Sequence, residues 1–218
     1  MANITKIKLE NLTYNIKDEL LSDKVIKNVL NFGAVGDGIT DDTIAIVNAL
    51  NSLNNNEALY FPAGDYIVYK DYVNNKNNPS YPIDKILKLV NKKNITLYGD
   101  GQSSRIRPAL QGIADTKLNY PCTLTIDKCE NIEIYNMCIE SKGENYGDAD
   151  AASSVAQNLR QVFVMSNGGV AILVSGSKKI NIHDCNFRLC GSCGVVYHSD
   201  ISDCLVKNCF ANAASLGY

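Results

Sequence analysis

The sequence has 218 residues, of which 45% are hydrophobic and 20% are charged, and its formal net charge is −2. This composition is typical of a globular domain with a sizeable core. The near-neutral charge, without a strongly basic run, argues against nucleic-acid binding, and no apolar stretch approaches the roughly 20 residues that insert into a membrane.

The N-terminus, MANITKIKLE, lacks the apolar core of a signal peptide. We therefore expect the protein to be made in a cytoplasm and to leave it by another route. In a chain of this length without a signal, the eight cysteines are expected to be reduced thiols rather than a disulfide framework.

Residues 4–16 alternate apolar and polar side chains, which predicts a short hairpin or two edge strands. In residues 17–28, the apolar residues are at helical spacing: Leu20, Leu21, Val25 and Ile26. This N-terminal segment has little core of its own. We predict that residues 1–27 form an attachment segment that buries its apolar residues against a partner chain.

Residues 28–69 combine a glycine-rich turn, an amphipathic helix and a strand pair, and they organise the rest of the chain. The turn contains Gly33, Gly36 and Gly38, which allow positive φ. Thr40 is the predicted N-cap of the helix, and Asp41 and Asp42 are predicted to lie in its first turn, where carboxylates favour the helix dipole.

The predicted helix carries one apolar stripe formed by Ile46, Leu50 and Leu53, widened by Ile44 and Val47. After it, residues 59–61 and 66–69 are predicted strands joined by the turn Pro62-Ala63-Gly64-Asp65. Residues 70–93 and 107–121 are predicted loops, with residues 86–90 docking back, and residues 94–98 are a further predicted strand.

A glycine-rich turn before a helix also suggests a phosphate site. GAVGDG lacks the Lys and Ser/Thr of a P-loop and the spacing of a dinucleotide site. The carboxylates of Asp37, Asp41 and Asp42 would repel phosphate. These residues could also bind a metal ion or act as an acid/base pair, but a role in capping the helix and forming the turn is favoured. We therefore expect no cofactor and no metal ion.

A repeat of 24 residues follows. Residues 132–139, 180–187 and 204–211 each have apolar residues at positions one, three, six and eight, and Ile132 to Ile180 spans twice the period. A fixed period of this kind predicts stacked parallel coils rather than a hairpin-linked sandwich. Residues 141–168 are longer and more polar than a corner requires, so we interpret them as an excursion outside the solenoid.

The strings FGAVGDGITDDTIAI and ALYFPAGDYIV, followed by YGDGQSSRI, resemble the pectate-lyase-like superfamily. This resemblance implies an all-β fold: a right-handed parallel β-helix with an N-terminal capping α-helix over its open end. The implied organisation is an attachment segment at residues 1–27, followed by the cap and first coils at residues 28–218. Because residues 211–218 begin another corner and no cap follows, we expect the β-helix to be completed by further chain or by partners.

The remaining cysteines and histidines carry weaker signals. Cys185 and Cys209 share a repeat position with Met137, which predicts an inward stack. The pair Cys190 and Cys193 lacks the further ligands of a zinc site, so core or corner thiols are favoured over a disulfide or a metal. His183 and His198 are predicted surface or corner residues.

No catalytic motif of the resembled superfamily could be placed on this sequence: the Asn-x-Asp, paired Asp, Gly-His-Gly and Arg-x-Lys motifs of its polygalacturonase branch and the acidic calcium cluster of its lyases have no match. Position alone suggests candidates in or beside the excursion that could line a sugar groove: Glu140, Glu144, Asp148, Asp150 and Arg160. A solvated acidic loop is the favoured alternative. Whether the protein is an enzyme is left open.

The string TYNIKDE resembles the beginnings of tail-fibre and baseplate proteins of phages of Gram-positive bacteria. Together the resemblances imply a homotrimeric tailspike or receptor-binding protein of a phage or phage-tail-like particle, located in the virion tail. Residues 1–27 would dock to tail or baseplate proteins, and the β-helix would bind host-surface polysaccharide, without nucleic acid or membrane insertion. The alternatives are a stand-alone polysaccharide lyase or glycoside hydrolase and a purely structural spacer.

Overall fold

The computed structural model describes residues 6–9, 12–15, 21, 23–68, 87–108, 122–141, 170–188, 190 and 193–212. Near the N-terminus, β1 (Lys6–Leu9) and β2 (Leu12–Asn15) pair antiparallel, which confirms the predicted hairpin. The helical spacing predicted for residues 17–28 is wrong at its C-terminal end, because β3 (Val25–Asn28) is a strand. It pairs with β5, so the last residues of the proposed attachment segment belong to the β-helix.

The main body consists of three parallel sheets, which we call walls 1, 2 and 3. Wall 1 contains β3, β5 (Glu57–Phe61), β8 (Lys93–Gly99), β11 (Glu130–Tyr135), β14 (Lys178–His183) and β17 (Leu205–Lys207). Wall 2 contains β4 (Asp37–Asp41), β6 (Gly64–Val68), β9 (Ser104–Pro108), β12 (Cys138–Glu140), β15 (Asn186–Arg188) and β18 (Phe210–Asn212). Wall 3 contains β7 (Leu87–Val90), β10 (Cys122–Asp127), β13 (Val170–Ser175) and β16 (Cys193–His198).

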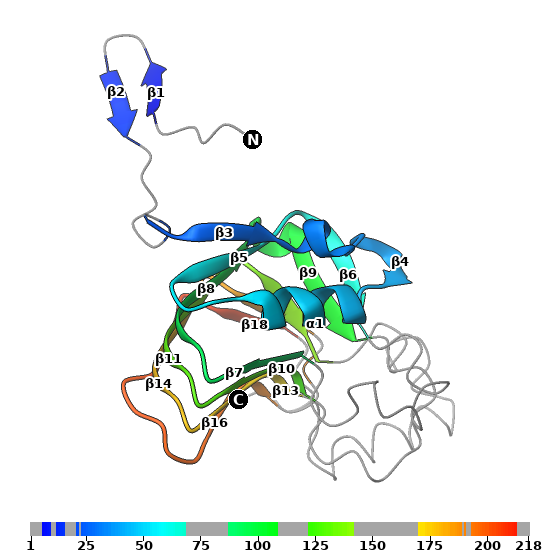
Figure 1. Cartoon of the computed structure of the whole chain (residues 1–218), viewed down its shortest axis with the longest axis vertical. Coiled ribbons are helices and arrows are strands. Elements are labelled where there is room, and N and C mark those ends of the chain that lie inside the picture. The colour runs from blue at the N-terminus through cyan, green and yellow to red at the C-terminus, as the bar shows by residue number, and fades with distance from the viewer. Residues whose placement is uncertain are drawn as a thin grey trace.

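The chain visits the walls in the same order in every coil, and each strand pairs in parallel with its counterpart in the next coil. This arrangement, visible in Figure 1 as strands stacked in colour order, confirms the predicted parallel β-helix. Asn181 pairs with Leu205, 24 residues further along. Ile132 pairs directly with Ile180, so the doubled interval between them is one coil lengthened between β12 and β13.

The interior consists of columns in which one side chain stacks on the equivalent side chain of the next coil. In wall 1 the register aligns Leu59, Leu97, Ile134 and Ile182, and all four are fully or almost fully buried. A coil cannot bury such a face alone, so stacking supplies the core.

The predicted sulfur column is confirmed. Met137 and Cys185 are buried and Cys209 is half-buried, all within or against the same core. Every cysteine whose side chain the structure describes is a free thiol, Cys190 included.

The corners between walls 3 and 1 repeat one backbone conformation. At equivalent positions of successive coils φ lies between 54° and 68°: Asn56, Asn94, Asn131, Lys179 and Asp203. Asn is among the few residues that adopt this left-handed conformation at low cost. Its side chains also stack, because Asn131 Nδ2 donates to Asn94 Oδ1 at 2.8 Å and Asn94 Nδ2 donates to Asn56 Oδ1 at 2.7 Å.

Helix α1 (Thr43–Ser52) closes the N-terminal end of the solenoid (Figure 1). Wall 3 begins only at β7, and α1 contacts β7 and the short 3-10 helix η1 (Val29–Phe32) in place of an earlier wall 3 strand. Ile46, Leu50 and Leu53 are buried, which confirms the predicted plug, whereas Ile44 is 51% exposed and lies outside the stripe.

The predicted helix start is wrong by two residues. The helix begins at Thr43, with Asp42 as the cap residue, while Thr40 and Asp41 lie in β4. Asp41 Oδ1 accepts hydrogen bonds from the backbone N–H and the hydroxyl of Thr43. Asp37 instead closes a local turn, accepting from Thr40 N at 2.7 Å.

Asp42 has a structural role that a helix cap does not describe. Its carboxylate is 1% exposed and accepts hydrogen bonds from Val35 N at 2.7 Å and Gly36 N at 3.1 Å. Its backbone also donates to Ile67 O at 2.7 Å. Asp42 therefore ties the glycine-rich turn to the end of the solenoid.

Candidate functional site

The long intervals of the chain all leave from one place in the fold. Turns from wall 3 to wall 1 and from wall 1 to wall 2 are short, whereas residues 69–86, 109–121 and 142–169 all connect wall 2 to wall 3. Those intervals lie outside the described residues, but the strands that bound them place their ends at the same edge. Long connections on a rigid scaffold are where binding residues concentrate, so the outer face of wall 2 is the candidate site.

Side chains on wall 2 alternate between core and outer face. Tyr66, Ile106, Ile139 and Phe187 point inward and are buried. The outward positions carry a set of charges that we call the charged ladder: Asp65, Arg105, Arg107, Glu140 and Arg188. The ladder crosses four adjacent strands, from β6 to β15, and carries one more positive than negative charge.

Asp65 joins the first two strands of the ladder. Arg105 Nη2 lies 2.6 Å and Arg107 Nη2 lies 2.8 Å from Asp65 Oδ2. Arg105 stands directly opposite Asp65 in the register. Burial acts to raise the pKa of Asp65, but the hydrogen bonds and charges of the two arginines outweigh it and hold the pKa below its usual range.

Asp65→Asn is expected to make the free energy of unfolding less dependent on pH in the acidic range. A carboxyl whose pKa is lowered by folding stabilises the protein above its unfolded pKa, near 4, and loses that contribution as pH falls through the folded pKa. The free energy of unfolding of the variant should be lower than that of the parent by on the order of 1 kcal/mol at pH 6, and the two should be equal near pH 2. Thermal unfolding between pH 2 and 6 measures it, with the exposed Asp200→Asn as control; a difference that stays constant with pH would contradict the assignment.

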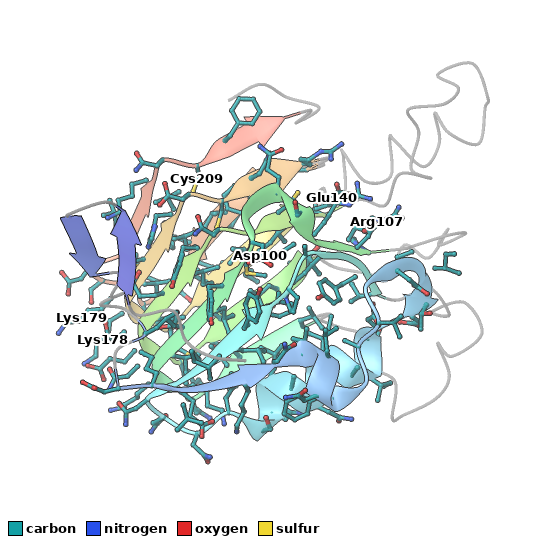
Figure 2. All side chains as sticks on the ribbon, turned by 90° about the horizontal axis from the view of Figure 1, so that it is seen from above. Asp100, Arg107, Glu140, Lys178, Lys179 and Cys209 are labelled. Carbon is teal, nitrogen blue, oxygen red and sulfur yellow. The ribbon has the colours of Figure 1, made fainter. Side chains whose placement is uncertain are left out.

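Glu140 is the one predicted catalytic candidate that the structure describes. Its side chain is fully buried, with Oε1 3.7 Å from Arg105 Nη1 and 3.8 Å from Arg188 Nε. A general acid must reach its substrate, and a carboxylate at 0% exposure between two guanidinium groups holds those groups in place instead. Figure 2 shows Glu140 and Arg107 on the same flank of the ribbon.

The other predicted candidates, Glu144, Asp148, Asp150 and Arg160, lie outside the described residues, so they stay predictions. Cys138, beside Glu140 in β12, is no nucleophile candidate, because burial, reinforced by the Glu140 charge, raises its pKa to about 12. Among the described residues, no group of His, Cys, Asp and Glu stands close enough together to hold a metal ion.

What the ladder offers chemically is a row of guanidinium groups on a rigid sheet. Arg105 and Arg107 retain 20% and 14% side-chain exposure, and Arg188 retains 41%. Guanidinium groups bind carboxylate, sulfate and phosphate groups with two parallel hydrogen bonds. Of this set, only Glu140 was predicted as a candidate. Asp65 and the three arginines follow no short motif, and the strands that bring them together are separated by long stretches of sequence.

Wall 1 carries a second ordered surface, a stack of rings on its outer face. Ring centroids lie 5.0 Å apart between Tyr60 and Tyr98, 5.6 Å between Tyr98 and Tyr135, and 5.0 Å between Tyr135 and His183. His183 also has Nε2 3.4 Å from Glu133 Oε2 and Nδ1 2.7 Å from an oxygen of the neighbouring Asp184. His183 is thus a satisfied outward residue, as predicted.

Comparisons with known proteins agree with this fold. Residues 26–121 match the family described as rhamnogalacturonase A/epimerase, pectate lyase-like. The chain is similar to plasmin and fibronectin-binding protein A of Streptococcus pneumoniae, with 34% identity over 97 residues, or 39% of this chain and 13% of that protein.

Two solved structures are similar over most of this chain. ORF18 of Geobacillus virus E2 superposes with a TM-score of 0.51 and 25% identity, covering 85% of this chain and 32% of that one. PfbA, a surface adhesin of Streptococcus pneumoniae, superposes with a TM-score of 0.55 and 21% identity, covering 88% of this chain and 39% of that one. The chain therefore spans well under half the length of each of these relatives. No helix among the described residues is long and apolar enough to cross a membrane.

Proposed function

Because this chain is a parallel β-helix of the pectate-lyase-like type, we propose that it belongs to a receptor-binding tail protein of a phage or phage-tail-like particle. In this proposal the β-helix binds polysaccharide on the host surface through the outer face of wall 2. The part of the predicted attachment segment that precedes β3, residues 1–24, docks the protein to the tail or baseplate, and three copies assemble into a trimer.

The charged ladder is the observation that carries the proposal. It places Arg105, Arg107 and Arg188 on one rigid face, beside the edge where the three long intervals leave the solenoid. Anionic groups are common on bacterial surface polysaccharides, and a row of arginines matches a chain that repeats its charge. The similarity to a phage protein and to a surface adhesin supports attachment, rather than metabolism, as the setting.

Binding to host-surface polysaccharide tests the proposal. The purified protein is expected to bind cell-wall polysaccharide preparations from a panel of Gram-positive bacteria, with affinity that falls as salt increases. Arg107→Ala should weaken binding about 10-fold, since one charge-assisted contact contributes roughly 1.5 kcal/mol or more. Isothermal titration calorimetry and whole-cell pull-down measure the effect.

Lys179→Asn is the matched control. Lys179 lies on the opposite side of the ribbon from Arg107 (Figure 2), and its φ of 55° suits Asn. This variant removes one positive charge without touching the ladder, so its binding should equal that of the parent. Equal losses in both variants would mean that net charge alone drives binding. If the protein bound none of the polysaccharides in the panel and was a monomer by light scattering, the proposal would be wrong.

A polysaccharide lyase or hydrolase is the second candidate, favoured by the description of the matching family. It predicts release of unsaturated or reducing sugar ends from an acidic polysaccharide, and loss of that activity in Glu144→Gln or Asp148→Asn. Glu140→Gln should affect stability more than turnover, because its carboxylate is buried. A glycan panel that yields no cleavage would leave binding as the function of this chain.

A further inference from the structure

Two cysteines occupy the same position in adjacent coils. Asn186 pairs with Phe210 across β15 and β18, and each follows a cysteine, so Cys185 lies next to Cys209 in the register. Phe210 N donates to Cys185 O at 2.9 Å, which holds the two corners together. Neighbouring parallel strands are about 4.8 Å apart, and this spacing lies within the Cα separation of roughly 4.4–6.8 Å found in disulfides.

Both thiols point into the same column. Cys185 Sγ lies 3.7 Å from Ile134 O, and Cys209 Sγ lies 3.7 Å from Ile182 O, each on the strand one coil earlier. Because the register aligns the two cysteines in adjacent coils, each sulfur has the other as its neighbour in the column.

The two thiols differ in access. Cys185 is 2% exposed, whereas Cys209 is half-buried and lies among the last strands of the solenoid (Figure 2). The adjacent Cys185 thiol outweighs the effect of burial and lowers the pKa of Cys209. Because the thiolate is the attacking species, Cys209 is the member of the pair that meets an oxidant first.

We propose that Cys185 and Cys209 form a disulfide that links two adjacent coils when the protein meets a low-molecular-weight disulfide such as oxidised glutathione. The Cys209 thiolate attacks one glutathione sulfur, forms a mixed disulfide and releases one glutathione thiolate. Cys185 then loses its proton to water and attacks the Cys209 sulfur, which releases the second glutathione. Two protein thiols are oxidised by two electrons, and one glutathione disulfide is reduced to two thiols.

The linkage closes a loop of 24 residues, from Cys185 to Cys209, that contains β15, β16 and β17. It would join the coil of β14 and β15 to the coil of β17 and β18, whose side chains Leu205 and Phe210 are 50% and 62% exposed. The pair would be reduced during synthesis in a cytoplasm and oxidised outside it, so the last coils would become harder to open after release.

Tryptic mapping tests the proposal directly. Cleavage after Lys179, Arg188 and Lys207 separates the pair, because residues 180–188 contain Cys185 and residues 208–218 contain Cys209. The three cysteines between them all fall in residues 189–207. After incubation with oxidised glutathione and alkylation, we expect residues 180–188 linked to the peptide that begins at Asn208, with a mass two hydrogens below the sum of the two peptides.

Thermal unfolding supplies the second readout. Oxidation should raise Tm by roughly 6 to 12 °C, and dithiothreitol should reverse the rise. Cys209→Ser should abolish both the linked peptide and the Tm shift, while Cys204→Ser, at the preceding corner, should retain both. Glutathione that stays on Cys209 without a linked peptide would overturn the proposal, and so would linkage of residues 208–218 to residues 189–207.

Discussion

Leu50→Ala is expected to lower the free energy of unfolding by about 3 to 4 kcal/mol. Leu50 is 2% exposed on the core side of α1, the helix that contacts β7 and η1 at the closed end of the solenoid. Removing its buried methyl groups costs their transfer free energy and leaves a cavity that a stacked core cannot readily collapse. Urea unfolding followed by circular dichroism measures the change, which corresponds to a drop in Tm of roughly 7 to 14 °C.

Ile44→Ala is the control on the same helix. Ile44 is 51% exposed, so its truncation removes little buried area, and alanine favours the helix. We expect a change within about 0.5 kcal/mol. Similar losses for Leu50→Ala and Ile44→Ala would contradict the orientation of α1 over the end of the solenoid.

Asp42→Ala is expected to cost about 3 kcal/mol, although no charged partner is lost. The carboxylate of Asp42, which is 1% exposed, accepts hydrogen bonds from Val35 N and Gly36 N, and the substitution leaves both part-buried amides without that acceptor. An orphaned buried donor costs roughly 1–3 kcal/mol. The glycine-rich turn should open first, so hydrogen exchange at Val35 and Gly36 should accelerate by more than at β11.

Asp37→Ala is the comparison for Asp42→Ala. Asp37 accepts from Ile39 N and Thr40 N within one exposed turn, where water can replace the carboxylate. Asp37→Ala should lower the free energy of unfolding clearly less than Asp42→Ala does, and it should leave amide hydrogen exchange at Gly36 unchanged. Equal effects would mean that the turn, rather than the buried carboxylate, secures this end of the fold.

Periodicity made the solenoid predictable. The apolar pattern of residues 132–139 returns at 180–187 and 204–211, and the structure stacks these segments in adjacent coils. The 24-residue period itself holds only for the last step, because Ile132 pairs directly with Ile180, 48 residues further on. The stripe of Ile46, Leu50 and Leu53 likewise predicted which face of α1 is buried. Both patterns are local or regular, so they can be found without knowing which coils touch.

The charged ladder and the ring stack could not be found in this way. Asp65 contacts Arg105 and Arg107 across 40 or more residues, and Tyr98, Tyr135 and His183 are separated by unequal intervals because each coil carries a connection of different length. Asp42 was assigned to the helix start because its contact with Gly36 depends on how the turn folds back. The ladder and the ring stack rest on long-range contacts and the Asp42 contact on the path of a loop, and sequence spacing alone defines neither.

The left-handed corners have a consequence for how such a protein can change in length. Asn94, Asn131 and Lys179 keep the same backbone conformation, although the coils that join them contain different numbers of residues. Because the corner conformation is the same in each coil, an added 24-residue coil would lengthen the solenoid by one strand spacing, about 4.8 Å along its axis. The coils beyond the insertion would keep their contacts and their register with one another. Additional residues between β12 and β13 do not change the length of the solenoid, because they leave the stacked strands in place. The length of the solenoid and the size of the connections from wall 2 to wall 3 can therefore vary independently. The length changes by whole coils, whereas a connection can change by any number of residues.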